Sequence, residues 1–158
     1  MNGNIKEIIH HPHPILRKVS TAIPGKKIKQ KNFQQFLNDL EATMMAKDGA
    51  GLAAPQIGVN DRVVVIFRPD NKHLFLINPQ ITRRSWGKKI EEEGCLSVVD
   101  EKGRIIYGPV ERHKRVTCIY YDREGKKKKI QADERLSRVI QHELDHLDGI
   151  LFIDHLIK

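Results

Sequence analysis

Two histidines near the end of the chain, His142 and His146, are spaced so that both can bind one metal ion. They belong to the segment Gln141–His146, in which residues 142–146 read H-E-x-x-H. Residues four apart lie on one face of an α-helix, so both imidazoles can reach the same ion. Glu143 lies beside them, where its carboxylate can accept a proton from water on that ion. A polar helix surface with two histidines fits the same pattern, so a third ligand is needed.

The chain contains only 2 cysteines, Cys95 and Cys118, and Cys95 is the stronger candidate for that ligand. Cys118 lies in an apolar, strand-like run, and we expect it to be a buried core thiol. Cys95 follows Gly94, and a glycine lets the backbone approach another group closely. The different settings of the two cysteines do not indicate a disulfide. Three protein ligands leave a coordination position open for water, which is typical of a catalytic site.

The segment 49–58 is dense in glycine and alanine and contains one side chain, Gln56, that can both donate and accept hydrogen bonds. Small residues let the main chain run close to another backbone or to a ligand. Gln56 is suited to polarising a carbonyl oxygen. A flexible loop with a surface glutamine fits the same segment equally well.

Taken together, these segments resemble the signatures of peptide deformylases. Gly49 to Gln56, Glu93 to Ser97 and Gln141 to Gly149 stand in that family's order, and the stretch His11–Arg17 is similar to its N-terminal region. The resemblance covers nearly the whole chain. It implies a metal-dependent hydrolase that removes the formyl group from N-formylmethionyl termini of nascent peptides and releases formate.

The resemblance also implies catalytic roles. Glu143 takes a proton from the attacking water and delivers it to the departing amine. The Gln56 side-chain amide and the backbone N–H of Leu96 donate hydrogen bonds to the developing oxyanion. Glu93 and Arg112 form a salt bridge that holds the cysteine loop. The metal ligands are Cys95, His142 and His146.

The substrate is expected to lie extended, like an added β-strand, between two segments of the chain. Three positions depart from the family pattern: Ala50 replaces a larger aliphatic residue, Val99 replaces proline, and Arg135 stands where an apolar residue often lines the side-chain pocket. They predict weaker discrimination in favour of methionine. The residues expected to contact the substrate are Gly49, Ala50, Gly51, Leu52, Gly94, Arg135 and Val139.

One divalent metal per chain is expected. One thiolate and two imidazoles suit Zn or Fe(II); the resemblance implies Fe(II) as the physiological ion, with Zn, Ni or Co able to replace it. A zincin-like protease would need a downstream third ligand, where His155 is the only histidine and no glutamate follows Glu143. A deformylase-like protein with a different first-residue preference fits the same residues, and so does a basic ribosome-associated protein that retains the fold.

The composition fits one catalytic domain spanning residues 1–158, since 39% of the residues are hydrophobic. No apolar run is long enough to cross a membrane, and the start has no signal-peptide pattern, which predicts a cytoplasmic setting. The resemblance implies a bacterial-type protein, and an organelle is the other compartment that fits. The net charge of +8 is concentrated in lysine runs at 26–31 and 126–129. Solvated loops are the favoured interpretation of these runs, and attraction to the ribosome is the other. We expect N-formylated nascent peptides as partners, no DNA, no membrane, and a monomer.

The pattern of the chain predicts an α+β fold, with antiparallel β-sheets around the C-terminal H-E-x-x-H helix and an N-terminal helix. Apolar residues at helical spacing predict the first helix, capped by Asn32 and ending before Gly49. Asp133 is expected to cap the last helix, and Gly149 to follow its end. Turn signals separate the expected strands, which are Arg62–Phe67, Leu74–Asn78, Gln80–Trp86, Arg104–Tyr107, Val116–Asp122 and Lys127–Gln131.

Overall fold

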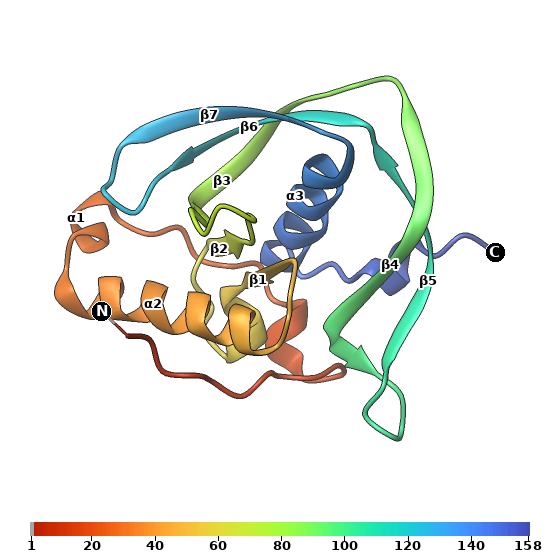
Figure 1. The fold of residues 1–158 in the computed structure, drawn as a ribbon, viewed down its shortest axis with the longest axis horizontal. Coiled ribbons are helices and arrows are strands. Elements are labelled where there is room, and N and C mark those ends of the chain that lie inside the picture. The colour runs from red at the N-terminus through yellow and green to blue at the C-terminus, as the bar shows by residue number, and fades with distance from the viewer. Residues whose placement is uncertain (1) are drawn as a thin grey trace.

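Two antiparallel sheets and two long helices, α2 and α3, form the α+β architecture of this protein, in a computed structural model that describes residues 2–158 (Figure 1). The larger sheet has the strand order β1-β2-β3-β6-β7, and the smaller sheet pairs β4 with β5. The strands are β1 (Gly51–Ala53), β2 (Val63–Ile66), β3 (Leu74–Arg84), β4 (Lys88–Val99), β5 (Ile105–His113), β6 (Arg115–Tyr121) and β7 (Lys127–Asp133). The α-helices are α1 (Gly25–Ile28), α2 (Lys31–Ala46) and α3 (Glu134–Leu147), and short 3-10 helices span Pro14–Arg17, Ala54–Ile57 and Phe152–His155.

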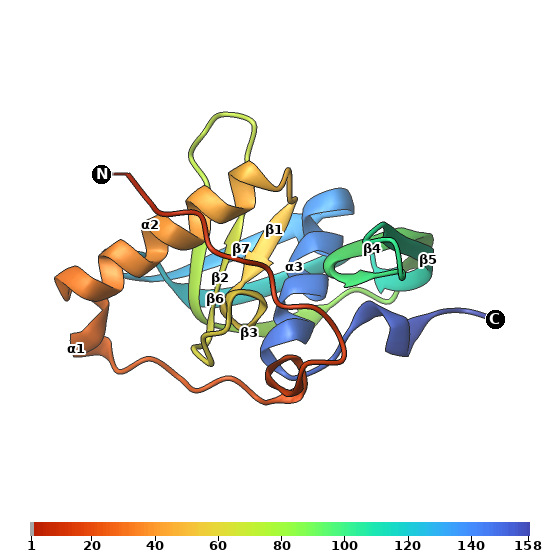
Figure 2. The same cartoon turned by 90° about the horizontal axis from the view of Figure 1, so that it is seen from below.

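Strand β2 separates two hydrophobic clusters because its side chains alternate between the two faces of the sheet. Val63 and Val65 pack with the apolar face of α2, while Val64 and Ile66 pack with α3. The two long helices therefore cover different parts of the larger sheet, and Figure 2 shows α3 between that sheet and the β4–β5 hairpin. This placement brings the H-E-x-x-H segment of α3 next to β4. Within residues 2–158, no helix is long and apolar enough to cross a membrane.

The predicted fold class is confirmed, and the element boundaries need corrections. Helix α2 begins at Lys31, and Asn32 does not cap it: its side chain accepts a hydrogen bond from the neighbouring Phe33 N–H instead. The two strands expected on either side of Pro79 are one strand, β3, whose ladder continues through a register shift at that point. Strand β5 likewise runs through Pro109, which an edge strand tolerates because proline lacks only an N–H donor.

Two strands, the short β1 and the long β4, were not predicted from the hydrophobic pattern, and β4 is the one that supplies site residues. Along β4 the inward-facing side chains are Glu93, Cys95 and Ser97, all of them buried. Alternate residues of a strand share one face, so these three side chains point toward the same region. A buried face made of polar residues does not give the alternation of apolar and polar residues by which strands are recognised.

An extended N-terminal segment ties several elements together. Its first part lies along α2, where the Asn4 N–H donates to the Asp39 carboxylate at 2.7 Å. Further on, the Ile9 N–H donates to the carbonyl of Gln56 at 2.7 Å, and the His11 N–H donates to the carbonyl of Ser97 at 2.8 Å. Figure 2 shows this segment crossing from α2 toward the β4–β5 hairpin. It bridges the Gln56 turn and β4.

Candidate active site

The three predicted metal ligands lie together at the junction of α3 and β4. One ligand atom from each of Cys95, His142 and His146 lies within 4.8 Å of the others. The Cys95 Sγ atom is 3.3 Å from His146 Nε2. One helical turn separates the two histidines, and β4 supplies the thiol from the facing side. The 3.6-residue period of α3 and the two-residue period of β4 therefore direct these three side chains to the same point.

Glu93 orients His142 from behind. Its Oε1 atom is 2.9 Å from His142 Nδ1, which leaves Nε2 of that ring free to face the cluster. Burial lowers the pKa of His142, but hydrogen bonds to Cys95 and Glu93 outweigh it and raise the pKa to about 10. The same neighbours that favour a proton on this ring favour a cation beside it. Burial lowers the pKa of His146 well below its usual value, so that ring is neutral, as a metal ligand must be.

Two arginines hold Glu93. Arg112 donates to both carboxylate oxygens, at 2.9 and 3.0 Å, which confirms the predicted Glu93–Arg112 salt bridge. Arg138 donates a further hydrogen bond at 2.6 Å and also binds the Val110 carbonyl at 2.9 Å. Burial opposes ionisation of Glu93, but hydrogen bonds from His142 and Arg112 hold its pKa well below the usual range. The carboxylate is thus a fixed anion behind the histidines.

Glu143 is placed differently from Glu93. Its side chain is buried, and its Oε2 atom has no hydrogen-bond partner among the described residues. Burial raises the pKa of Glu143 to about 7. Gly51 makes room for this side chain, since a Cβ atom at that position would lie 2.8 Å from the Glu143 Cγ atom. A carboxylate with an unpaired oxygen and a pKa near neutrality is suited to accept and return a proton.

Gln56 points its amide nitrogen at the cysteine. Its Oε1 atom accepts a hydrogen bond from the Ala53 N–H at 3.0 Å, which fixes the orientation of the amide group. Its Nε2 atom then donates to Ser97 Oγ at 3.1 Å and lies 3.6 Å from Cys95 Sγ. The side chain is buried, so its donor is held next to the ligand cluster and not in a surface loop.

A cleft of about 410 Å³ opens in front of these groups, between the 48–51 loop, β4 and α3. Three of the predicted site residues do not line it: Leu52 is fully buried in the core, Arg112 binds Glu93 behind His142, and His146 is enclosed. The predicted site residues that do line the cleft are Gly49, Ala50, Gly51, Gln56, Glu93, Gly94, Cys95, Leu96, Arg135, Val139, His142 and Glu143.

Three groups of this site were not predicted from the sequence. Arg138, one turn before His142, carries a buried guanidinium that also binds Glu91 at 3.1 Å. Ser97 accepts the hydrogen bond from Gln56. Tyr107 on β5 pairs with Gly94, and its ring packs so closely on this glycine that a Cβ atom on residue 94 would lie 2.6 Å from the Tyr107 ring. Arg138 lies four residues before His142, so helical spacing could have placed it on the same face of α3. The position of Tyr107 depends on the register of the β4–β5 hairpin, which the sequence does not indicate.

The donor set fits a divalent metal ion. A thiol, a neutral imidazole and a second imidazole fixed by a carboxylate are the ligand types that Zn and Fe(II) bind. Three ligands from the protein leave a position for water or substrate. The carboxylate behind His142 and the free carboxylate of Glu143 in front give this group the surroundings of a hydrolytic metal centre.

Comparison with known proteins agrees with this chemistry. The family model described as "Polypeptide deformylase" matches residues 5–158. A peptide deformylase of Rhizobium meliloti is 39% identical over 158 residues, covering 98% of this chain and 86% of that protein. The crystal structure of a peptide deformylase from Synechococcus elongatus in complex with actinonin is 35% identical with a TM-score of 0.88, covering 97% of this chain and 79% of that chain. A Met-Ala-Ser-bound peptide deformylase from Acinetobacter baumannii is 28% identical with a TM-score of 0.88, covering 96% of this chain and 98% of that chain.

Proposed function

The chain belongs to the peptide deformylase family, and from that premise we propose that residues 1–158 are one catalytic domain whose cleft performs the deformylation. The protein is a metal-dependent hydrolase that removes the formyl group from N-formylmethionyl termini of nascent peptides, releasing formate. The observation that supports the location most directly is the unpaired, buried oxygen of Glu143 beside the Cys95, His142 and His146 cluster.

We propose that Cys95, His142 and His146 hold one divalent metal ion. When bound, the ion lowers the pKa of water and polarises the formyl carbonyl. Fe(II) is the proposed physiological ion, with Zn, Ni or Co able to replace it, because a thiolate and two imidazoles accept all of these. Glu93 keeps the His142 ring in the orientation that directs Nε2 to the ion.

Glu143 is the proposed general base and acid. It takes a proton from the attacking water as the new bond to the formyl carbon forms. It then gives the proton to the departing amine nitrogen, so that the amine leaves neutral. Its raised pKa, about 7, suits both directions of transfer near neutral pH.

Gln56 and Leu96 are the proposed donors to the oxyanion. The Gln56 amide nitrogen is already directed at the cysteine, 3.6 Å from Sγ, with its orientation fixed by Ala53. Leu96 follows Cys95 on β4 and lines the same cleft, so its backbone N–H is the second proposed donor. Donors held in place before the reaction stabilise the developing negative charge without reorganisation.

The substrate peptide is proposed to lie as a strand between two unpaired edges. Among residues 2–158, β1 is an edge strand of the larger sheet, and β4 pairs only with β5. Residues Gly49–Gly51 and Gly94–Leu96 line opposite sides of the cleft. A peptide between them can exchange backbone hydrogen bonds with both edges. Arg135 and Val139 are then beside its first side chain.

We place the reaction in the cytoplasm, on chains emerging from the ribosome, with the enzyme acting as a monomer. An organelle of bacterial descent is the other compartment consistent with the substrate. N-formylated nascent peptides are the proposed partners, because the cleft receives an extended chain end.

Formate release tests the proposal. Protein prepared without oxygen and loaded with Fe(II) or Ni(II) is given formyl-Met-Ala-Ser, and formate is measured with time. Acetyl-Met-Ala-Ser is the matched control, and we expect no turnover of it because the acetyl methyl group is larger than the formyl hydrogen. Protein that carries one metal ion per chain and releases no formate would contradict the proposal.

A further inference from the structure

One face of the larger sheet is left uncovered. On β6, Val116, Cys118 and Tyr120 are buried toward α3, while the alternate residues point the other way. Figure 1 shows the long helices on one side of β6 and β7 only. We call the other side of β3, β6 and β7 the open face. Its residues on β6 are Arg115, Thr117, Ile119 and Tyr121, and their partners on β7 are Asp133, Gln131, Lys129 and Lys127.

The open face is basic, and its cations are unpaired. Arg83 joins it from β3, opposite Thr117. Within residues 2–158 no carboxylate forms an ion pair with Arg83, Arg115, Lys127 or Lys129, although the neighbouring Lys126 and Lys128 do pair, with Glu124 and Asp122. Asp133 is the acidic residue on this face, beside Arg115 in the ladder. Arg115 and Lys127 lie six residues apart in register, which is about 20 Å along the strand.

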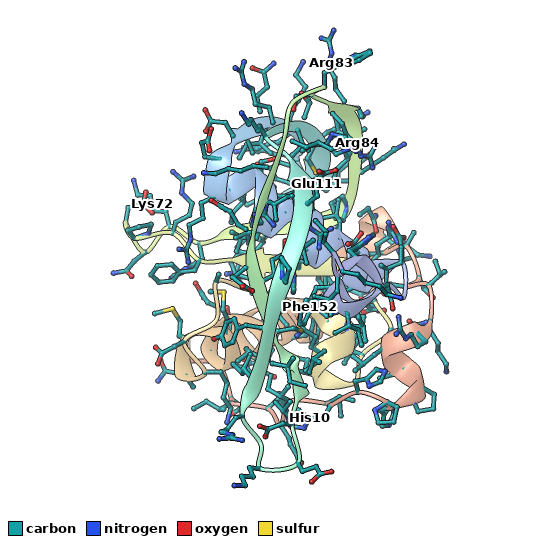
Figure 3. All side chains as sticks on the ribbon, turned by 90° about the vertical axis from the view of Figure 1, so that its right-hand side faces the viewer. His10, Lys72, Arg83, Arg84, Glu111 and Phe152 are labelled. Carbon is teal, nitrogen blue, oxygen red and sulfur yellow. The ribbon has the colours of Figure 1, made fainter. Side chains whose placement is uncertain are left out.

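A fully exposed tryptophan stands at the end of this face. Trp86 lies in the turn between β3 and β4 and is 101% exposed. The turn is fixed by backbone hydrogen bonds, since Ser85 N–H donates to the Arg115 carbonyl and Lys114 N–H donates to the Gly87 carbonyl, both at 2.9 Å. Figure 3 shows the nearby Arg83 and Arg84 projecting at this end of the molecule. The fold thus holds an indole in water, in the turn that directly follows Arg83 and Arg84 in the chain.

A shallow hollow of about 470 Å³ lies at the end of β3 and β6 nearest the turn that carries Trp86. Arginines line it from both strands, together with polar side chains that can donate or accept hydrogen bonds: Arg83, Arg84, Arg115, Thr117 and Gln131. None of these residues lines the catalytic cleft. Among residues 2–158, Asp133 is the one acidic residue that lines the hollow, against three arginines, so the hollow is a second surface, separate from the cleft, with a net positive lining.

We propose that the open face and Trp86 bind single-stranded RNA, with phosphates on the arginines and lysines and a base stacked on the indole. Unpaired cations spread over a strand attract a phosphate backbone without reading its sequence. A base stacks on an exposed aromatic ring regardless of base identity. The choice of RNA among polyanions rests on the proposed function, because nascent chains are presented by a particle that is rich in RNA.

The first arm of the test measures binding of a fluorescein-labelled single-stranded RNA of mixed sequence by anisotropy over a range of salt concentrations. The variant R83E/R115E is compared with K18E/K102E, which changes the net charge equally at exposed lysines away from the open face. We expect R83E/R115E to weaken binding on the order of tenfold and to reduce the slope of log affinity against log salt by about 1.4. K18E/K102E should bind like the wild type, and an equal loss in both variants overturns the proposal.

The second arm uses Trp86 itself, the only tryptophan in the chain. We expect RNA to quench its fluorescence, and W86A to weaken RNA binding on the order of tenfold without changing the salt slope. Binding with no change in Trp86 fluorescence, or no binding at all, overturns the proposal. Turnover of formyl-Met-Ala-Ser should be unchanged in every variant. A wild type that binds RNA but releases no formate would contradict the proposed catalysis and leave this surface supported.

Discussion

The two sides of His142 differ in how completely their buried polar atoms are paired. Behind the ring, Glu93 is bound by His142, Arg112 and Arg138, and both of its oxygens accept hydrogen bonds. In front, Glu143 is equally buried but keeps one oxygen without a partner among the described residues. Both carboxylates lie in the same small region of α3 and β4.

This difference separates positioning from chemistry. An ionised carboxylate with several charge-assisted hydrogen bonds is held in one place and is a poor proton acceptor. A buried carboxylate with an open oxygen is costly to fold, and its pKa rises toward the range where protons are exchanged. We expect changes in front of His142 to remove activity at little cost in stability, and changes behind it to reduce stability first.

The largest expected effect is the loss of the metal. Cys95→Ala should abolish stoichiometric metal binding and reduce turnover to background, because two imidazoles alone bind the ion weakly. Metal per chain is measured by elemental analysis after gel filtration. Cys118→Ala is the matched control: that thiol is buried in the core, so the variant should keep its metal. Full metal occupancy in Cys95→Ala would show that the ligand assignment is wrong.

Glu143→Gln should lower kcat by roughly 10²–10⁴-fold while metal content is retained, because it removes the base and preserves the shape. Steady-state formate release and metal content are measured on the same preparation. The free energy of unfolding should not fall, since burial disfavours the ionised carboxylate more than His142 and Arg112 favour it, which is why the pKa of Glu143 is raised to about 7. Near-normal turnover with metal bound would exclude Glu143 as the base.

Gln56→Leu should lower kcat by roughly 10²–10³-fold through loss of an oxyanion donor. The loss of kcat should exceed any rise in KM, because the developing charge exists only in the transition state. Initial rates over a range of formyl-peptide concentrations separate the two. A variant with unchanged kcat and raised KM would make Gln56 a binding residue only.

On the other side of His142, Arg138→Met should reduce the free energy of unfolding by about 1–3 kcal/mol, because Glu93 and two carbonyls lose a charged donor. Urea unfolding measures the change. Arg135→Met is the matched control on the same helix; Arg135 is exposed, and we expect a change within about 0.5 kcal/mol. Equal stabilities of the two variants would show that the hydrogen-bonded groups around Glu93 do not stabilise the fold more than the residues that face the cleft.

The smallest effect concerns substrate choice. Arg135→Leu should increase the preference for formyl-Met over formyl-Ala peptides by roughly tenfold, since one apolar contact gives about 1–3 kcal/mol of discrimination and a tenfold change is about 1.4 kcal/mol. The ratio of kcat/KM values for the two peptides gives the result. An unchanged, steep preference for methionine would show that Arg135 points away from the first side chain.

The sequence was most informative where chemistry and periodicity coincide. His142, Glu143 and His146 follow from helix geometry alone, and the apolar stripe of α2 located that helix to within two residues of its start. Burial of Cys118 followed from its apolar run, and the structure buries it fully, raising its pKa to about 11.

The sequence was least informative where burial is polar. Strand β4 turns Glu93, Cys95 and Ser97 inward, so its hydrophobic pattern does not indicate a strand even though its motif indicated a site. Arg138 was overlooked because charged residues are usually exposed, and only the tertiary partner Glu93 explains its burial. Tyr107 reaches Gly94 through the register of the β4–β5 hairpin, which no local pattern encodes.

The N-terminal segment has a consequence for how the protein folds. Its hydrogen bonds to Gln56 and Ser97 join positions far apart in sequence, and the histidines come from the last helix. Closing such long loops is entropically costly, and contacts of this kind slow folding. The catalytic groups therefore come together only when both ends of the chain are in place. Partly folded chains should bind metal weakly, so the rate of metal binding during refolding should report the rate of the last folding step.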